Sequence, residues 1–315
     1  MIHPHYQPNP PQELQIFKHL ASRTNLSIEE KLNFEKLCKG YEGEVEFYQV
    51  LQKNPMKNWI DLHSLRFFDG TTEFQLDHLI ICPTKVYLIE MKNYEGDYFI
   101  QNGNWYTAAR KKEIRNPLHQ LKRSEIMLRH QLQELGYNHP IESFVIFINP
   151  AFTLYQAPMD LPIILPTQIK RFVNQLNRSG TSSTITEHQK RLTNLLIARN
   201  RKQSAYEKLP QYHFEQMKKG IICHLCTNFL SIHGRKKLIC ESCGYMENFY
   251  TGVLRSILEF QCLFPNKKIT VNTIHEWCEL FQTKSFIRRM LKKYLISVGT
   301  SRKSTYYIFE GEREK

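Results

Sequence analysis

The stretch "QLDHLIICPTKVYLIEMKNYEG", residues 75–96, contains two apolar, strand-like runs joined by a Pro-Thr-Lys turn. Asp77 interrupts the first run, and Glu90 and Lys92 interrupt the second run near its end. A charge inside a sheet core is costly unless it is paired or binds a metal. The stretch therefore predicts a hairpin whose three charged residues serve a site.

The neighbouring sequence predicts a mixed α/β core around this hairpin. "WIDLHSLRFF" (59–68) and "SFVIFI" (143–148) have the pattern of further strands, and "YEGEVEFYQVLQ" (41–52) that of a helix. A second helix is predicted for 116–135, with Asn116 as N-cap, Pro117 at the first helical position and Gly136 closing it.

The three charges suit a metal site for phosphate chemistry. Residues two apart on a strand share a face, so Glu90 and Lys92 lie side by side, and hairpin pairing brings Asp77 near Glu90. Two carboxylates form a hard-oxygen site for Mg²⁺ or Mn²⁺, and Lys92 is placed to hold a water or a phosphate oxygen. The alternative is an ion pair on a solvent-facing sheet, worth under about 1 kcal/mol.

Two further side chains converge on the same place. Glu44 shares a helical stripe with Phe47 and Leu51, so this acid points toward the sheet. Gln120 lies one turn into the second helix, near its positive end, within reach of a phosphate or a water.

Residues 38–155 resemble the nuclease-related domain (NERD), a branch of the PD-(D/E)xK, restriction-endonuclease-like superfamily. The matching pieces are "KGYEGE" (39–44), "LDHLII" (76–81), "YLIEMKNYEG" (87–96), Trp105 and "NPLHQ" (116–120). The resemblance implies a mixed-sheet nuclease fold and hydrolysis of DNA phosphodiester bonds. It also implies that Asp77 and Glu90 are metal ligands, Lys92 the catalytic lysine, and Glu44 and Gln120 supporting site residues.

Four of the eight cysteines form two Cys-x-x-Cys pairs, "CHLC" (223–226) and "CESC" (240–243). Paired knuckles of this spacing predict a structural Zn²⁺ held by four thiolates, Cys223, Cys226, Cys240 and Cys243, and the segment resembles a zinc ribbon. His224 and His233 are alternative ligands. The other cysteines, Cys38, Cys82, Cys262 and Cys278, are predicted to be packing residues.

The C-terminal sequence predicts three helices (251–264, 272–281 and 285–296) and then a hairpin, an order that resembles a winged helix. In the third helix an apolar face is predicted for Phe286, Ile287, Met290, Leu291 and Tyr294. The opposite, basic face and the hairpin tip are predicted to bind nucleic acid through Arg288, Arg289, Lys292, Lys293, Arg302 and Lys303. The alternatives are an ordinary solvated face and a protein-interaction module.

Bulk composition sets the remaining expectations. The chain has 315 residues, 41% of them hydrophobic, and a net charge of +13, which favours a globular protein with a polyanionic partner, DNA above all. Neither a secretory signal nor a membrane-length apolar run is evident, so a cytoplasmic protein without membrane contact is expected. A homodimer or a partner protein is compatible with these features.

The sequence thus predicts five segments: an N-terminal extension with a helix (1–37), the nuclease-like domain (38–155), a helical basic connector (156–220), a zinc ribbon (221–249) and a winged-helix-like domain (250–315). The leading function is a Mg²⁺-dependent deoxyribonuclease. The alternative is a non-catalytic DNA-binding protein that keeps the nuclease fold as a platform.

Overall fold

The computed structural model describes residues 8–54, 58–68, 70, 72–179, 184–201, 209–234, 237–279, 284–299 and 305–309. The chain divides into two compact units. Unit 1 comprises Met1–Pro11 and Glu35–Glu207, and unit 2 comprises Gln12–Phe34 and Lys208–Lys315. Among the described residues, none of the helices is both long enough and apolar enough to cross a membrane.

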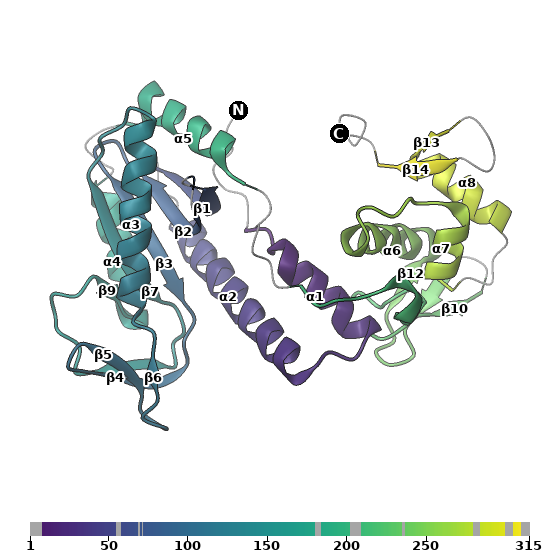
Figure 1. The fold of residues 1–315 in the computed structure, drawn as a ribbon, viewed down its shortest axis with the longest axis horizontal. Coiled ribbons are helices and arrows are strands. Elements are labelled where there is room, and N and C mark those ends of the chain that lie inside the picture. Colours follow the sequence, from purple (N-terminus) through teal and green to yellow (C-terminus); the bar gives the residue numbers. More distant parts are fainter. Residues whose placement is uncertain are drawn as a thin grey trace. The chain divides into compact units, whose positions relative to one another are not determined.

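Unit 1 is an α/β unit built on two sheets (Figure 1). Its helices are the part of α2 (Ile28–Lys53) from residue 35 onward, α3 (Pro117–Glu134), α4 (Ile169–Ser179) and α5 (Glu187–Arg199). Its strands are β1 (Ile60–Phe68), β2 (Glu73–Ile81), β3 (Val86–Lys92), β4 (Gly96–Gln101), β5 (Asn104–Thr107), β6 (Glu113–Ile114), β7 (Ile141–Phe147), β8 (Phe152–Tyr155) and β9 (Ile163–Ile164).

The larger sheet has the order β1-β2-β3-β7-β9. Strands β1, β2 and β3 are antiparallel neighbours, whereas β3, β7 and β9 run parallel. The β3–β7 crossover contains α3, whose N-cap Asn116 accepts a hydrogen bond of 2.9 Å from the Leu118 N–H, as the sequence predicts. Gly136, with φ of +79°, follows the helix in the left-handed conformation.

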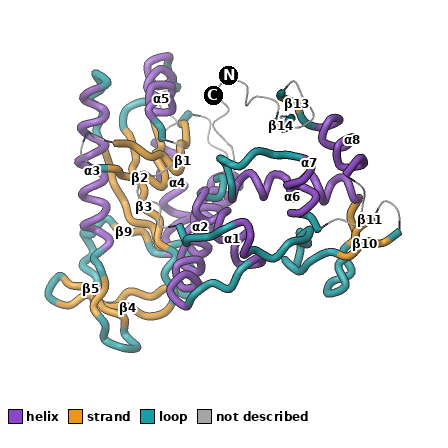
Figure 2. Tube along the Cα trace, turned by 45° about the vertical axis from the view of Figure 1, so that its right-hand side comes forward, coloured by secondary structure: helices purple, strands orange, loops and turns teal. Residues whose placement is uncertain are grey.

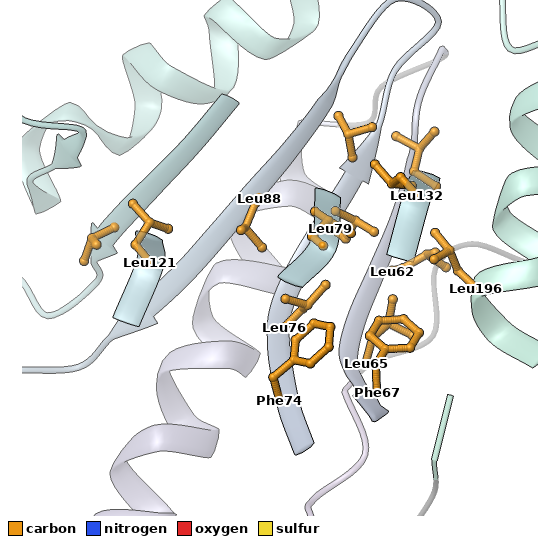
Figure 3. Packing of buried hydrophobic residues seen from close by; sticks show 14 of the residues in the cluster. Leu62, Leu65, Phe67, Phe74, Leu76, Leu79, Leu88, Leu121, Leu132 and Leu196 are labelled. Atoms are coloured by element: carbon orange, nitrogen blue, oxygen red, sulfur yellow. The ribbon is translucent and has the colours of Figure 1, made fainter. Parts of the chain in front are cut away.

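Both faces of this sheet are covered, so apolar side chains are buried on alternate positions of the same strands. On one face, Leu79 and Leu88 pack with Leu121 and Leu132 of α3 and Leu196 of α5 (Figure 3). On the other face, Phe47 and Leu51 of α2 pack with residues of β2, β3, β7 and α4. Because helices cover both faces of the sheet, a charged side chain of a central strand can reach water only near the ends of that strand.

A second sheet, of order β6-β5-β4-β8, lies beside the end of α3 at which that helix begins (Figures 1 and 2). This sheet was not predicted from the sequence. Its central turn is Asn102-Gly103, where both residues have positive φ (51° and 79°), the conformation that a tight hairpin requires.

Unit 2 combines an N-terminal helix with the C-terminal part of the chain. Its described helices are α1 (Gln12–Arg23), the start of α2, α6 (Phe249–Leu263), α7 (Val271–Trp277) and α8 (Lys284–Tyr294). Its strands are β10 (Ser231–His233), β11 (Lys237–Ile239), β12 (Met246–Asn248), β13 (Ile296–Val298) and β14 (Tyr306–Ile308). Short 3-10 turns occur at Pro166–Gln168 in unit 1 and Phe214–Gln216 in unit 2.

Helix α1 is anchored in unit 2 by a buried ion pair. Arg23 is 0% exposed, and its Nε and Nη2 lie 2.7 and 2.8 Å from the two carboxylate oxygens of Glu259 on α6. Its other donors bind the backbone carbonyls of Lys218 and Gly220, and its guanidinium carbon lies 3.7 Å from the Trp277 ring centroid. Four of the five N–H donors of this arginine are therefore placed on acceptors, and the guanidinium plane lies over an aromatic ring.

The predicted fold class is confirmed: the chain is mixed α/β, with mixed sheets and a cysteine cluster compatible with a zinc ribbon. The C-terminal order of three helices followed by a hairpin is also as predicted, and Ile269 forms an isolated bridge to Tyr307 of β14. The five segment boundaries and the likeness to a winged helix stay predictions.

Candidate active site and cysteine cluster

A polar pocket of about 930 Å³ opens in unit 1 where β2, β3, α2 and α3 meet. All five predicted site residues line it: Glu44, Asp77, Glu90, Lys92 and Gln120. They come from four elements and span 77 positions of sequence, so only the folded chain brings them together.

The β2–β3 hairpin places Asp77 beside Glu90. The antiparallel register pairs Leu79 with Leu88 and His78 with Ile89. Continuing this register by one residue brings Asp77 of β2 opposite Glu90 of β3. The backbone N–H of Met91 donates a hydrogen bond of 2.8 Å to Asp77 Oδ2 and holds this carboxylate at the end of β3. The predicted proximity of these two acids is observed.

Lys92 connects the strand to helix α3. Its Nζ donates to Glu90 Oε1 at 2.7 Å and to Gln120 Oε1 at 3.0 Å. Burial lowers the pKa of Lys92, but the charge and hydrogen bond of Glu90 outweigh this effect, and the pKa is raised above its usual value. The ammonium group therefore stays charged at neutral pH, with two of its three N–H donors engaged.

The carboxylates are unusually basic because they are buried close to one another. Burial, followed by the charge of Asp77, raises the pKa of Glu44 to about 7 and that of Glu90 to about 8. Burial also raises the pKa of Asp77, against the lowering effects of the Met91 N–H and of Lys92. Such a group of acids gains stability from a bound cation.

Glu44 is held by a residue that the sequence analysis missed. The Ser64 hydroxyl donates a hydrogen bond of 2.8 Å to Glu44 Oε2. Ser64 has a φ of 51°, and the β1–β2 pairing skips from His63–His78 to Leu65–Leu76, so Ser64 and Asp77 face each other at a break in the ladder. Such irregularities redirect side chains next to functional sites.

A second buried pair adjoins the site and was also missed. His78, beside Asp77 in sequence, is 0% exposed, and its Nδ1 lies 3.2 Å from Asp61 Oδ1. Burial lowers the pKa of His78, but the charges of Asp61, Glu44 and Asp77 and the Asp61 hydrogen bond raise it overall. A sequence signal exists, since Asp61 and His78 each interrupt an apolar strand.

The wall of the pocket carries basic side chains. Arg115 lines it just before α3, and His119 and Arg123 line it from the first two turns of α3, together with the exposed acid Glu113. Arg123 Nη2 also donates to Thr72 Oγ1 at 3.3 Å. The basic side chains of the wall suit an anionic substrate, and the carboxylates at the bottom of the pocket suit a metal ion that such a substrate would contact.

The donor set of the pocket fits a hard divalent cation. Glu44, Asp77 and Glu90 each accept one hydrogen bond from the described protein, which leaves a second oxygen on every carboxylate. The acids are not packed into a closed cage: among the described residues, only the cysteine cluster brings three or more metal-binding donors within 4.8 Å of one another. A site with few protein ligands suits Mg²⁺, which retains several waters.

The cysteine cluster lies in unit 2. The Sγ atoms of Cys223, Cys226, Cys240 and Cys243 all lie within 4.8 Å of one another, with Cys223–Cys243 at 3.7 Å and Cys226–Cys240 at 3.3 Å. Tetrahedral zinc with Zn–S bonds of about 2.3 Å requires sulfur separations of about 3.8 Å. The four cysteines can thus hold a zinc ion without His224 or His233.

The two cysteine knuckles share one backbone design. In the first, Cys223 N–H binds Asn228 O and Thr227 N–H binds Cys223 O; in the second, Cys240 N–H binds Tyr245 O and Gly244 N–H binds Cys240 O. Thr227 and Gly244 hold equivalent positions with φ of 62° and 73°. The same tight turn is therefore present in both knuckles.

The predicted basic face of α8 is only partly exposed. Arg289, Lys292 and Lys293 are exposed and Arg288 is half-buried, while Ile287, Met290 and Leu291 form the buried face. Tyr294, predicted to face inward, is instead 41% exposed because it lies at the end of the helix. Arg302 and Lys303 lie outside the described residues.

Two known proteins are similar to part of this chain. Over 104 residues the chain is 33% identical to an uncharacterized protein of Bacillus anthracis, pXO1-01; the match covers 30% of this chain and 49% of that protein, so the chain spans about half the length of this relative. The crystal structure of protein VC1899 from Vibrio cholerae covers 57% of this chain and 59% of that chain, at 11% identity and a TM-score of 0.26, a value too low to support an argument about the fold.

Residues 39–148 match the family model named nuclease-related domain, NERD. Every residue that lines the polar pocket falls within this range. Residues 39–148, with the pocket they enclose, are therefore a nuclease-related domain.

Proposed function

We propose that this protein is a metal-dependent nuclease that hydrolyses DNA phosphodiester bonds in the polar pocket of unit 1. One observation carries the proposal: the Lys92 ammonium joins Glu90 to Gln120 while Asp77 stands beside Glu90 at the end of the same hairpin. The nuclease-related domain supports a nuclease-related function, and the arrangement supplies what phosphodiester hydrolysis requires.

In this mechanism Asp77 and Glu90 would hold a Mg²⁺ or Mn²⁺ ion. Such an ion would supply positive charge for the phosphodiester and would make a bound water more acidic. Lys92 donates its remaining N–H to the attacking water or to a phosphate oxygen, and its raised pKa keeps it a donor rather than a base. Gln120 accepts a hydrogen bond from Lys92 and so orients its ammonium group. Glu44 is the third carboxylate of the pocket, and the hydrogen bond from Ser64 holds it in place.

DNA is the proposed substrate because cations surround the acidic floor. Arg115 and Arg123 are placed on the pocket wall, where they can bind the phosphates that flank the bond to be cut. In unit 2 we propose that the basic face of α8, with Arg288, Arg289, Lys292 and Lys293, binds nucleic acid as part of a winged-helix-like module, in the same unit as a structural zinc site.

The test is cleavage of plasmid and single-stranded DNA with Mg²⁺ or Mn²⁺. Asp77→Asn keeps the shape of the side chain and removes the charge needed for the metal, so cleavage should fall at least about 100-fold. Asp97→Asn changes an exposed aspartate of β4 outside the pocket and should leave cleavage unchanged. Equal cleavage by wild type and Asp77→Asn would overturn the proposed site.

The second candidate function is a non-catalytic DNA-binding protein. The exposed cations of α8 favour it, since they lie in a different unit from the pocket and do not depend on catalysis. DNA binding without metal-dependent cleavage by the wild type would select this alternative.

A further inference from the structure

Unit 2 presents three aromatic rings in a row, contributed by two helices. The Tyr250 ring, in the first turn of α6, lies 5.5 Å from Phe286 and 6.4 Å from Tyr294, both of α8. Tyr250 and Phe286 are half-buried, whereas Tyr294 is 41% exposed. The inner rings pack against the helices, and the outer ring offers an aromatic surface to the solvent.

Cations border this aromatic row. Arg289 and Lys293 follow Phe286 by three and seven residues, so they lie on the same side of α8 as that ring. Lys293 Nζ lies 5.2 Å from the centroid of the Tyr294 ring. Within the described part of the chain neither Arg289 nor Lys293 forms an ion pair with a carboxylate, so both charges remain available to a ligand.

We propose that Tyr250, Phe286 and Tyr294, with Arg289 and Lys293, form a binding platform for single-stranded nucleic acid. Unpaired bases have open faces that stack on aromatic side chains, and the neighbouring cations bind the phosphates of the same strand. A duplex turns its base faces inward and offers only groove edges and backbone, so an exposed tyrosine ring adds little to duplex binding.

This inference deepens the proposed function, because it names the strand form that the protein would hold. It can nevertheless fail independently. The platform belongs to unit 2 and the cleavage pocket to unit 1, and binding is measurable without added Mg²⁺. Loss of cleavage with intact single-strand binding counts only against the nuclease.

The first experiment measures the Kd of the full chain for a labelled 20-nucleotide single strand and for the duplex of the same sequence, by fluorescence anisotropy. The wild type should bind the single strand more tightly. Tyr294→Leu should weaken single-strand binding about 10-fold and leave duplex binding nearly unchanged. Tyr294→Phe keeps the ring and should bind like the wild type. Tyr155→Leu, which removes a tyrosine of unit 1 that is 53% exposed, should also bind like the wild type.

A second experiment separates stacking from charge. A strand with abasic sites keeps its phosphates but has no bases, so Tyr294→Leu should cause no further loss of affinity for it. Lys293→Gln should reduce the slope of log K against log salt by about 0.7, the value for one phosphate contact on a single strand, whereas Tyr294→Leu should not change that slope.

Two results would overturn the platform. One is equal affinity of the wild type for single strand and duplex. The other is unchanged single-strand affinity of Tyr294→Leu, with circular dichroism and zinc content confirming that the variant is folded.

Discussion

The Ser64 hydroxyl donates a hydrogen bond to Glu44, and Ser64 itself lies opposite Asp77 at the break in the β1–β2 ladder. This relationship joins a backbone irregularity to the acidic floor of the pocket. It also gives Ser64 two separable properties, a hydrogen bond that Ala and Gly both lose and a φ of 51° that Gly tolerates better.

Ser64→Ala and Ser64→Gly should therefore differ in stability in a definite order. Both lose the donor to a buried carboxylate, at a cost of about 1–3 kcal/mol. The Ser64→Gly variant should be less destabilised than Ser64→Ala by about 1 kcal/mol, because glycine adopts the left-handed backbone conformation without steric strain. Urea unfolding measures the difference.

Ser143 is the matched control, since its hydroxyl donates a 2.8 Å hydrogen bond to Glu125 Oε2 from the regular strand β7. There the order should reverse, with Ala more stable than Gly. The same order at both serines would show that the backbone at Ser64 is not strained.

The raised pKa of Glu90 predicts how stability depends on pH without divalent cations. The folded state retains a proton on Glu90 up to a pKa of about 8, whereas the unfolded chain releases it near 4.5, so the folded state binds more protons between these values. Unfolding free energy should therefore fall as pH rises through this window, by up to about 1.4 kcal/mol per pH unit for this group.

Glu90→Gln should flatten that pH profile, as measured by urea unfolding at pH 5 to 8.5. Mg²⁺ needs the ionised carboxylate, so it should raise the melting temperature more at pH 8 than at pH 6 in the wild type. An equal effect of Mg²⁺ on wild type and Glu90→Gln would argue that the cation binds elsewhere.

Zinc should be required for the integrity of unit 2 and not of unit 1. Cys226→Ser removes one of four thiolates and should lower the zinc content well below about one ion per chain. Hydrogen exchange should then rise in residues 221–248 while the strands of unit 1 stay protected.

Cys262→Ser is the control for this prediction, because Cys262 is half-buried and lies outside the cysteine cluster. It should keep its zinc. Full zinc content in Cys226→Ser, measured by atomic absorption, would contradict the four-thiolate site.

The Arg23–Glu259 pair should contribute strongly to the stability of unit 2. Arg23→Ala leaves Glu259 buried without its partner, which costs about 3–5 kcal/mol. The double variant Arg23→Met, Glu259→Leu removes both charges and should be more stable than Arg23→Ala alone. Hydrogen exchange of α6 reports on this unit; unaltered protection in Arg23→Ala would contradict the prediction.

The sequence predicted what depends on local pattern. The hairpin of β2 and β3 follows from apolar runs around Pro83, and α3 follows from Asn116 and Pro117 at its start. The grouping of the acidic residues and Lys92 into one site was also predictable, because a charged side chain in an apolar strand is costly to bury unless it is paired or binds a metal. The Asn102-Gly103 dipeptide is a hairpin signal in the sequence and marks the turn of the second sheet.

Other features could not be predicted locally. Arg23 is separated from Glu259 by 236 positions, and nothing in "QELQIFKHLASR" (12–23) indicates which segment covers that helix. The break at Ser64 depends on how β1 pairs with β2, and a serine in a strand gives no warning of positive φ. Such features arise from tertiary context, which overrides local propensity.

The placement of α1 has a consequence for biogenesis. Because Gln12–Phe34 belongs to the same compact unit as Lys208–Lys315, the nuclease-related domain is an insertion within the other domain's sequence. During translation the inserted domain is synthesised in full while α1 still awaits its partner α6, so Arg23 emerges long before Glu259 exists to receive it. The inserted domain is thus positioned to fold first, and the unit that contains the cysteine cluster is completed only after residues 208–315 have also left the ribosome.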